Sequence, residues 1–215
     1  MNPTPDNLPD PRTPPHRKRI HHYEVPGQAR MLTFSCYLRT ALLLDERWRL
    51  LLAQAISSAT LHHRWLLLAF VFMPEHVHLV LAPRDGASSA SALLVAIKRP
   101  TSFRVKQVLA ATHDPLLSTL TIRERPGKMA FRFWQEGPGH DSNLEVADQL
   151  GNPIAYVHSN PAIRKLCDRP EQWKWSSARQ YLGLDVEPGI PRVTTWSWGN
   201  GLESEGRRSA QRPLV

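Results

Sequence analysis

The most constraining feature of the sequence is a long apolar stretch broken by one short turn, "RWLLLAFVFMPEHVHLVLA", residues 64–82. The runs on either side of Pro74-Glu75 each have the length of a β-strand and are rich in β-forming residues. Two such neighbouring strands bury their apolar side chains only inside a sheet, so we expect this pair at its centre. His76 and His78 occupy alternate positions at the start of the second strand.

The segments around this pair predict an α+β fold. "MLTFSCYL" from Met31 predicts a strand, and a helix follows with Asp45 as its cap. "GASSASALLVAIKRPTSFRVKQVLA" predicts a second helix, capped by Ser88 or Ser89 and kinked or divided at Pro100. "AFRFWQEG" predicts a fourth strand. The resulting order is the ferredoxin-like split β-α-β plan, an antiparallel sheet with helices on one face, here with a C-terminal helical extension.

The domain organisation follows from where the apolar pattern begins and ends. Residues 1–22 are Pro-rich and basic and are predicted to be disordered. Residues 23–183 form the predicted domain, with 112–129 as an irregular surface excursion, and no structure is assigned to the tail 184–215. Cys36 and Cys167 fit neither a metal pair nor a disulfide framework, so we expect a reducing cytosol. No secretion signal or membrane span is indicated.

The charge balance is strongly basic. Lys and Arg number 27 against 19 Asp and Glu, giving a formal net charge of +8. This excess favours a polyanionic partner, most simply a nucleic acid. A basic protein without such a partner is the alternative.

The spacing of the two histidines indicates a shared face. Side chains at positions i and i+2 of a strand point the same way, so His76 and His78 project side by side while Val77 and Leu79 face the opposite side. Two neighbouring imidazoles can bind one metal ion. The alternative is one surface histidine and one satisfied core histidine.

A further candidate pair lies in "IAYVHSNP". Tyr156 and Asn160 are four residues apart and share a helical face, whereas His158 lies on a different face. A core tyrosine and an asparagine that caps the helix before Pro161 are the alternative. Pro153 at the first helical position would shorten this helix to about two turns; otherwise a longer helix is kinked there. Glu75 is either an outer carboxylate beside the histidines or, the interpretation we favour, a turn residue.

Four motifs occur in order: "FMPEHVHLVL", "FRFWQEGPGHDSN", "IAYVHSNPAIRKL" and "EQWKWSSARQYLG". Together they resemble the single-tyrosine HUH transposases, in particular the REP-associated tyrosine transposases of bacteria, over residues 33–183. The resemblance implies that His76, His78 and Asn160 bind Mg²⁺ or Mn²⁺ and that Tyr156 is the nucleophile. His140 departs from the pattern, because close relatives are expected to carry an aromatic residue there.

The function implied by this resemblance is that of a transposase, a single-stranded DNA endonuclease and strand-transferase. It would cleave near hairpin repeats through a 5′-phosphotyrosine intermediate. The expected partner is single-stranded or hairpin DNA, with no membrane partner. We expect a monomer rather than a dimer, in the bacterial cytoplasm and at the nucleoid when bound to DNA.

Several side chains are candidates for the DNA-binding surface, by cationic charge or by stacking on bases. They are Lys98, Arg99, Arg104, Lys106, Trp173 and Trp175. Trp134 is assigned to the core instead. Two other functions stay open. One is a non-catalytic, domesticated nucleic-acid-binding descendant of the same family. The other is a small metal-dependent hydrolase, for which Glu75 is the one convincing general base.

Overall fold

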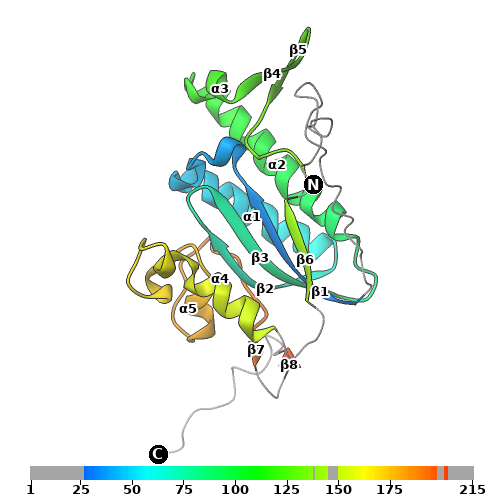
Figure 1. Cartoon of the computed structure of the whole chain (residues 1–215), viewed down its shortest axis with the longest axis vertical. Helices are drawn as coiled ribbons and strands as arrows, with labels where there is room; N and C mark the ends of the chain where they lie inside the picture. The colour runs from blue at the N-terminus through cyan, green and yellow to red at the C-terminus, as the bar shows by residue number, and fades with distance from the viewer. Residues whose placement is uncertain (1–26, 138, 145–149, 198–200, 203–215) are drawn as a thin grey trace, which may run out of the picture.

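A four-stranded antiparallel sheet in the order β2-β3-β1-β6 forms the centre of the molecule (Figure 1). The computed structural model describes residues 27–137, 139–144, 150–197 and 201–202. The strands of this sheet are β1 (Ala29–Ser35), β2 (Trp65–Phe72), β3 (His76–Pro83) and β6 (His140–Leu144). The two apolar strands predicted at the centre pair directly, and every side chain of β2 except Leu66 is buried.

Two long helices cover one face of the sheet, α1 (Glu46–His62) and α2 (Ala90–Ala111). Helix α1 connects β1 to β2, and β3 lies between these two strands, so the topology is a split β-α-β arrangement. Asp45 accepts a hydrogen bond from the backbone N–H of Arg47 and Ser89 accepts one from Ala92, which confirms both predicted caps. Helix α2 runs through Pro100 as one helix, so of the two predicted alternatives, a kink or a division, the division is wrong.

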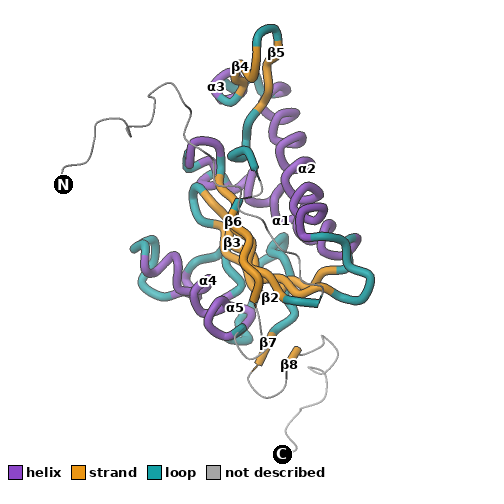
Figure 2. The backbone as a smooth tube through the Cα atoms, turned by 45° about the vertical axis from the view of Figure 1, so that its right-hand side comes forward, coloured by secondary structure: helices purple, strands orange, loops and turns teal. Residues whose placement is uncertain are grey.

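The other face of the sheet is covered by α4 (Gly151–Ile163), as Figure 2 shows from the side. Ile154 and Val157 of this helix pack against Leu68, Val71 and Val80 of the sheet. The prediction of helices on one face describes α1 and α2, and the C-terminal extension, for which no face was predicted, covers the other face. The reason is that β2 is apolar on both faces, and a strand of that kind requires a cover on each side.

The chain between α2 and β6 differs from its prediction. Residues 112–129 contain a short helix, α3 (Leu116–Thr119), and the strand β4 (Thr121–Arg125), which forms a hairpin with β5 (Lys128–Phe131). The predicted strand 130–137 is wrong beyond Phe131. Phe133 and Trp134 are buried as core side chains, Trp134 forms a single bridge with Cys36, and the fourth strand of the sheet begins later, at His140.

The remaining elements are short. Three are 3₁₀ helices, η2 (Tyr37–Arg39), η3 (Leu42–Leu44) and η5 (Pro170–Gln172); the others are α5 (Ala178–Tyr181), β7 (Trp196–Ser197) and β8 (Gly201–Leu202). No helix among the described ranges combines the length and the apolar character that crossing a bilayer requires.

Part of the predicted C-terminal tail is built into the core. Ile190 and Val193 are buried, and the side chain of Gln180 bonds the backbone on both sides of this segment, at Pro191 and Val193. The backbone N–H of Thr194 donates to the carbonyl of Leu67 in β2 at 2.9 Å. The predicted disordered segment 1–22 lies outside the described residues, as do 198–200 and 203–215 of the tail.

Candidate active site

The two histidines of β3 meet on the face of the sheet that carries α4. A tight turn precedes them, in which the N–H of Met73 donates to the carbonyl of His76 at 2.8 Å. His76 and His78 are 6% and 5% exposed, and their Nε2 atoms are 2.9 Å apart. Val77 and Leu79 point into the opposite core, as the strand alternation predicts.

The outer nitrogen of each ring has its own partner. Nδ1 of His76 donates to the carboxylate of Glu75 at 3.1 Å, and Nδ1 of His78 is 2.7 Å from the hydroxyl of Thr33 on β1. A carboxylate only accepts hydrogen bonds, so Glu75 fixes the proton of His76 on Nδ1 and leaves the Nε2 lone pair facing His78. Glu75 is itself buried and forms ion pairs with Arg164 and, at 3.8 Å, with Arg39. Glu75 therefore does more than occupy the turn, because its carboxylate contacts His76 and two arginines.

The electrostatics keep both imidazoles neutral at pH 7. Burial, and then the neighbouring His76, lower the pKa of His78 to about 4. Burial also lowers the pKa of His76, against the opposing effect of Glu75. Burial raises the pKa of Glu75, but the hydrogen bond from Arg164 and the neighbouring charges hold it below its usual value. Neutral imidazoles beside an ionised carboxylate have the protonation states that metal ligation requires.

Helix α4 adds an amide and a phenol to this place. Asn160 is buried, and its side-chain nitrogen lies 3.4 Å from Nε2 of His78. Tyr156 lies one turn earlier; its ring centroid is 5.6 Å from that of His78, in an edge-on arrangement, and the residue is 47% exposed. Helix α4 is 13 residues long, with Pro153 in its first turn and Pro161 in its last. The two-turn helix that Pro153 suggested is therefore wrong.

Two further polar residues belong to this region, His158 of α4 and Arg164, which follows the helix as its C-cap. Nε2 of His158 is 2.8 Å from the hydroxyl of Ser177, so this side chain points away from the histidine pair, as predicted. The sequence analysis did not identify Arg164 as a site residue, although Tyr156, Asn160 and Arg164 follow one another at helical spacing. The sequence analysis did not identify Thr33 and Arg39 as parts of the site either. The contact of Thr33 with His78 depends on strand register, and the position of Arg39 depends on a turn in which this residue has a positive φ of 53°.

Some of the DNA-binding candidates are buried or hydrogen-bonded within the fold, and the others are exposed. Lys98 donates to the backbone carbonyls of Gln135 and Gly137, and burial lowers its pKa. Trp175 is 4% exposed and stacks on Phe72, so its assignment to base stacking is wrong. Trp173 is half-buried, and its Nε1–H donates to the carbonyl of Phe72.

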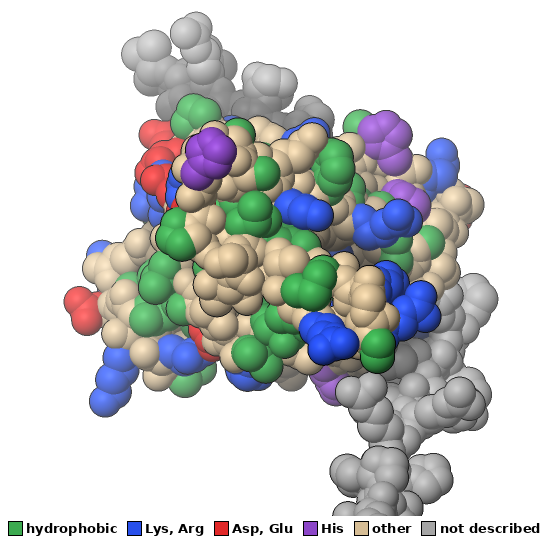
Figure 3. Space-filling view, turned by 90° about the horizontal axis from the view of Figure 1, so that it is seen from above, with side chains coloured by type: hydrophobic (Ala, Val, Ile, Leu, Met, Phe, Trp, Pro, Cys, Tyr) green, Lys and Arg blue, Asp and Glu red, His purple; other side chains and the backbone are tan. Residues whose placement is uncertain are grey.

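Arg99, Arg104 and Lys106 are exposed along α2, on the opposite face of the sheet from Tyr156. Arg104 donates to the side-chain oxygen of Gln54. Figure 3, seen from above, shows Lys and Arg side chains over much of one end of the molecule and acidic side chains mainly towards its left edge. Trp134 is in the core, as predicted.

The donor set of the site is small. Within the described ranges, no three His, Cys, Asp or Glu side chains form a group that could hold a metal ion. The candidate ligands are therefore two imidazoles and one amide, and Glu75 contacts His76 rather than the space between the rings.

Comparison with known proteins decides the fold. No family model and no curated protein matches the chain. A solved REP-associated tyrosine transposase bound to a REP hairpin matches it with a TM-score of 0.57 at 15% identity, covering 90% of this chain and 97% of that one. The chain has the fold of a REP-associated tyrosine transposase. A candidate transposase from Deinococcus radiodurans R1 matches with a TM-score of 0.41 at 17% identity, over 65% of this chain and 94% of the other.

Proposed function

We propose that the chain is a metal-dependent tyrosine transposase that nicks single-stranded DNA near hairpin repeats and rejoins it. The observation that carries this proposal is the meeting of four side chains on one face of the sheet. Nε2 of His76 and of His78 lie 2.9 Å apart, with the amide of Asn160 beside them and the exposed phenol of Tyr156 one helical turn away. The solved transposase of the same fold holds a REP hairpin, which supports hairpin DNA as the partner.

The residues present fit a divalent metal. Glu75 directs the lone pair of His76 Nε2 towards His78, and when the proton of His78 is on Nδ1, donated to the hydroxyl of Thr33, both rings present a lone pair to one point where a cation can join them. His76, His78 and Asn160 would hold Mg²⁺ or Mn²⁺, and the two imidazoles suit Mn²⁺ at least as well as Mg²⁺. When bound, the ion supplies a Lewis acid that polarises a phosphate oxygen.

The chemistry proposed for Tyr156 is a transesterification. Its hydroxyl oxygen attacks the scissile phosphorus, loses its proton, and forms a 5′-phosphotyrosine bond, while the 3′-oxygen departs as a free 3′-hydroxyl. A 3′-hydroxyl then attacks the phosphotyrosine, which restores a phosphodiester and returns the phenol. Each step exchanges one phosphate ester for another, so no nucleotide cofactor is consumed.

The cations beside the site are suited to hold the scissile phosphate. Arg39 and Arg164 both pair with Glu75, and their side chains are 67% and 45% exposed, so an incoming phosphate can reach both guanidinium groups. The side of Tyr156 that faces solvent is open to the same strand. These residues position the DNA and leave the bond exchange to the phenol.

A non-catalytic, domesticated DNA-binding descendant is the alternative function. The observation that favours it is the neutral donor set of two imidazoles and one amide, because hard Mg²⁺ prefers oxygen ligands. A protein of this kind would keep the fold and the basic surface without efficient cleavage.

Covalent capture separates the two functions. The purified protein is mixed with Mn²⁺ and a pool of oligonucleotides that carry a hairpin with randomised single-stranded flanks, and adducts are resolved on a denaturing gel. We expect an SDS-resistant adduct that Tyr156→Phe abolishes while DNA binding persists. Tyr37→Phe is the matched control and keeps the adduct. No adduct with the unaltered protein, despite binding, favours the descendant.

A further inference from the structure

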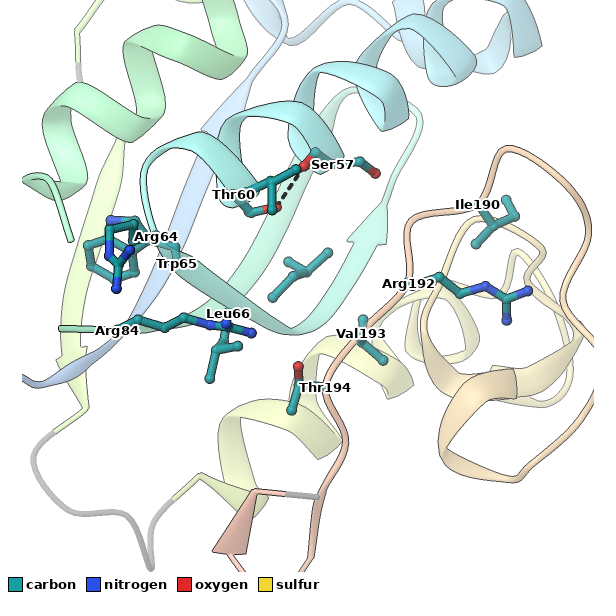
Figure 4. Close-up of a pocket in the computed structure, with 12 residues that line it drawn as sticks. Ser57, Thr60, Arg64, Trp65, Leu66, Arg84, Ile190, Arg192, Val193 and Thr194 are labelled. Carbon is teal, nitrogen blue, oxygen red and sulfur yellow. Dashed lines mark hydrogen bonds between the residues drawn. The ribbon is translucent and has the colours of Figure 1, made fainter. Parts of the chain in front are cut away.

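A cavity of about 520 Å³ lies at the far end of the central strands from the histidine pair (Figure 4). It is bounded by the end of α1, the start of β2, the residue after β3 and the segment 190–194. Its floor is apolar, formed by side chains such as Leu66 and Val193. Among the described residues that line it, the charged ones are three arginines, Arg64, Arg84 and Arg192.

These arginines have no ionic partner among the described residues. Some cations elsewhere are paired, as Arg47 is with Asp45 and Lys174 with Glu46, and others, such as Arg99 and Lys106, form no ion pair in the described ranges; the three arginines of the cavity differ in lining one hollow. Figure 4 shows Arg64 and Arg84 on one side of the cavity and Arg192 on the other. Three charges that have no ionic partner in the described part of the chain, spread over one hollow, suit a ligand with several phosphates better than a single ion.

The walls of the cavity are held in place. Arg64 ends the α1–β2 turn with a positive φ of 61°, and its Nε–H donates to the backbone carbonyl of Asp85 at 2.6 Å. The N–H of Arg84 donates to the carbonyl of Arg64 at 2.8 Å, which ties the two turns together. The opposite wall is fixed by Gln180 and by the bond from Thr194 to β2. The backbone that carries the arginines is therefore held in place before a ligand binds.

A second hollow adjoins this cavity. A second cavity of about 370 Å³ shares Trp65 and Arg84 with the first and extends to the start of α2, at Ser89 and Ala90. The N-terminus of this 22-residue helix carries partial positive charge from the helix dipole. Asp85 also lines this second cavity, so the cationic groups that it offers to a phosphate chain are Arg84 and the N-terminus of α2.

We propose that this arginine pocket binds the phosphate backbone of a hairpin stem whose base lies at the tyrosine site. Arg84 is eight residues after His76 along β3, a distance of about 26 Å at 3.3 Å per residue. Stacked base pairs rise about 3.4 Å each, so the straight-line separation of the two sites corresponds to the rise of about eight base pairs. The inference rests on the proposed function for the identity of the DNA, and it assigns to the stem a contact surface separate from the cleavage site.

The test uses a double substitution, Arg84→Gln with Arg192→Gln, which removes two charges and keeps most of the length of both side chains. Arg123→Gln with Arg125→Gln is the matched control, because these arginines lie on the β4–β5 hairpin and form no ion pair within the described ranges. Three fluorescent probes are used: a hairpin with a stem of about 12 base pairs, a hairpin with a stem of about 4 base pairs, and the flanking single strand alone. The stem sequence is arbitrary, because contacts to phosphates do not read sequence. Binding is measured by anisotropy over a range of salt.

We expect the pocket variant to bind the long hairpin about 10- to 60-fold more weakly at 0.1 M salt, with a salt slope smaller by about 1.8. Its affinity for the short hairpin and for the single strand should match that of the control. An equal loss on all three probes, or no loss on the long stem, overturns the proposal. The covalent adduct with the short hairpin reports on the proposed function separately, and the pocket variant should form it normally.

Discussion

At the scale of single residues, Glu75 gives the candidate site its chemistry. A buried imidazole alone does not specify which nitrogen carries the proton, but the carboxylate of Glu75 places it on Nδ1 of His76. Arg164 in turn keeps this carboxylate ionised in spite of its burial. The result is a carboxylate–imidazole pair of the kind that orients metal ligands.

Replacing Glu75 with Gln tests this role. The variant loses the fixed tautomer and one negative charge near the site, so we expect the Mn²⁺ concentration that gives half-maximal adduct to rise about 10- to 100-fold. Glu136→Gln, an exposed glutamate outside the site, should leave this concentration unchanged. A Glu75→Gln variant with the Mn²⁺ requirement of the unaltered protein would show that the carboxylate plays no part in ligation.

Residues related by local periodicity can be predicted from the sequence, and residues related by strand pairing cannot. The strand spacing of His76 and His78 and the helix spacing of Tyr156 and Asn160 are enough to put each pair on one face. The contact of Thr33 with His78 depends on the register of β1 against β3, which no local pattern encodes. The burial of Trp175 is equally hidden, because nothing in its neighbourhood along the chain indicates that its ring stacks on Phe72.

At the scale of elements, the position of α4 decides whether a site exists at all. The helix is held to the sheet by Ile154 and Val157 on one side, and the chain that follows it is tied back through His158 and Ser177. Element order predicts the split β-α-β sheet, since it depends on apolar periodicity. It does not predict the second covered face or the late start of β6, because both depend on how distant segments pack.

The half-buried His158 of this helix predicts a pH dependence of stability. Burial lowers the pKa of His158 to about 4 in the folded state, whereas the unfolded chain takes up the proton near 6.5. The unfolded state therefore binds more protons between these values, so the stability present above pH 6.5 is lost as the pH falls towards 4. The contribution of this group is about 3 kcal/mol.

Urea unfolding at a series of pH values measures this effect. His158→Gln should show a shallower loss of unfolding free energy between pH 6.5 and 4 than the unaltered protein, while the contribution of His78, which has the same sign, remains. His62→Gln, at an exposed position on α1, is the control and should follow the unaltered curve. Identical slopes for His158→Gln and the unaltered protein would contradict the assigned cause.

At the scale of the whole molecule, one chain supplies every part of the candidate site. Helix α4 packs on the sheet of its own chain, so Tyr156 and Asn160 reach His76 and His78 without a second copy. Arg39 and Arg164 lie at this centre, and further exposed cations lie apart from it, along α2 and around the arginine pocket. This separation suits a substrate with one reacting bond and an extended charged backbone.

A complete site within each chain predicts that inactive variants do not rescue one another. A mixture of Tyr156→Phe with a His76→Ala, His78→Ala double variant should form no adduct, because neither chain holds both the phenol and the metal ligands. The two variants are tested singly and together at equal total concentration. An adduct that appears only in the mixture would mean that α4 exchanges between copies.

The most direct measurement of the central claim is identification of the amino acid that carries the DNA. The adduct formed with Mn²⁺ is digested with nuclease and trypsin, and the nucleotide-bearing peptide is sequenced by mass spectrometry. The account predicts a phosphodiester on Tyr156 and on none of the other three tyrosines. A nucleotide found on Tyr37, on Tyr181 or on a residue of another type would contradict it.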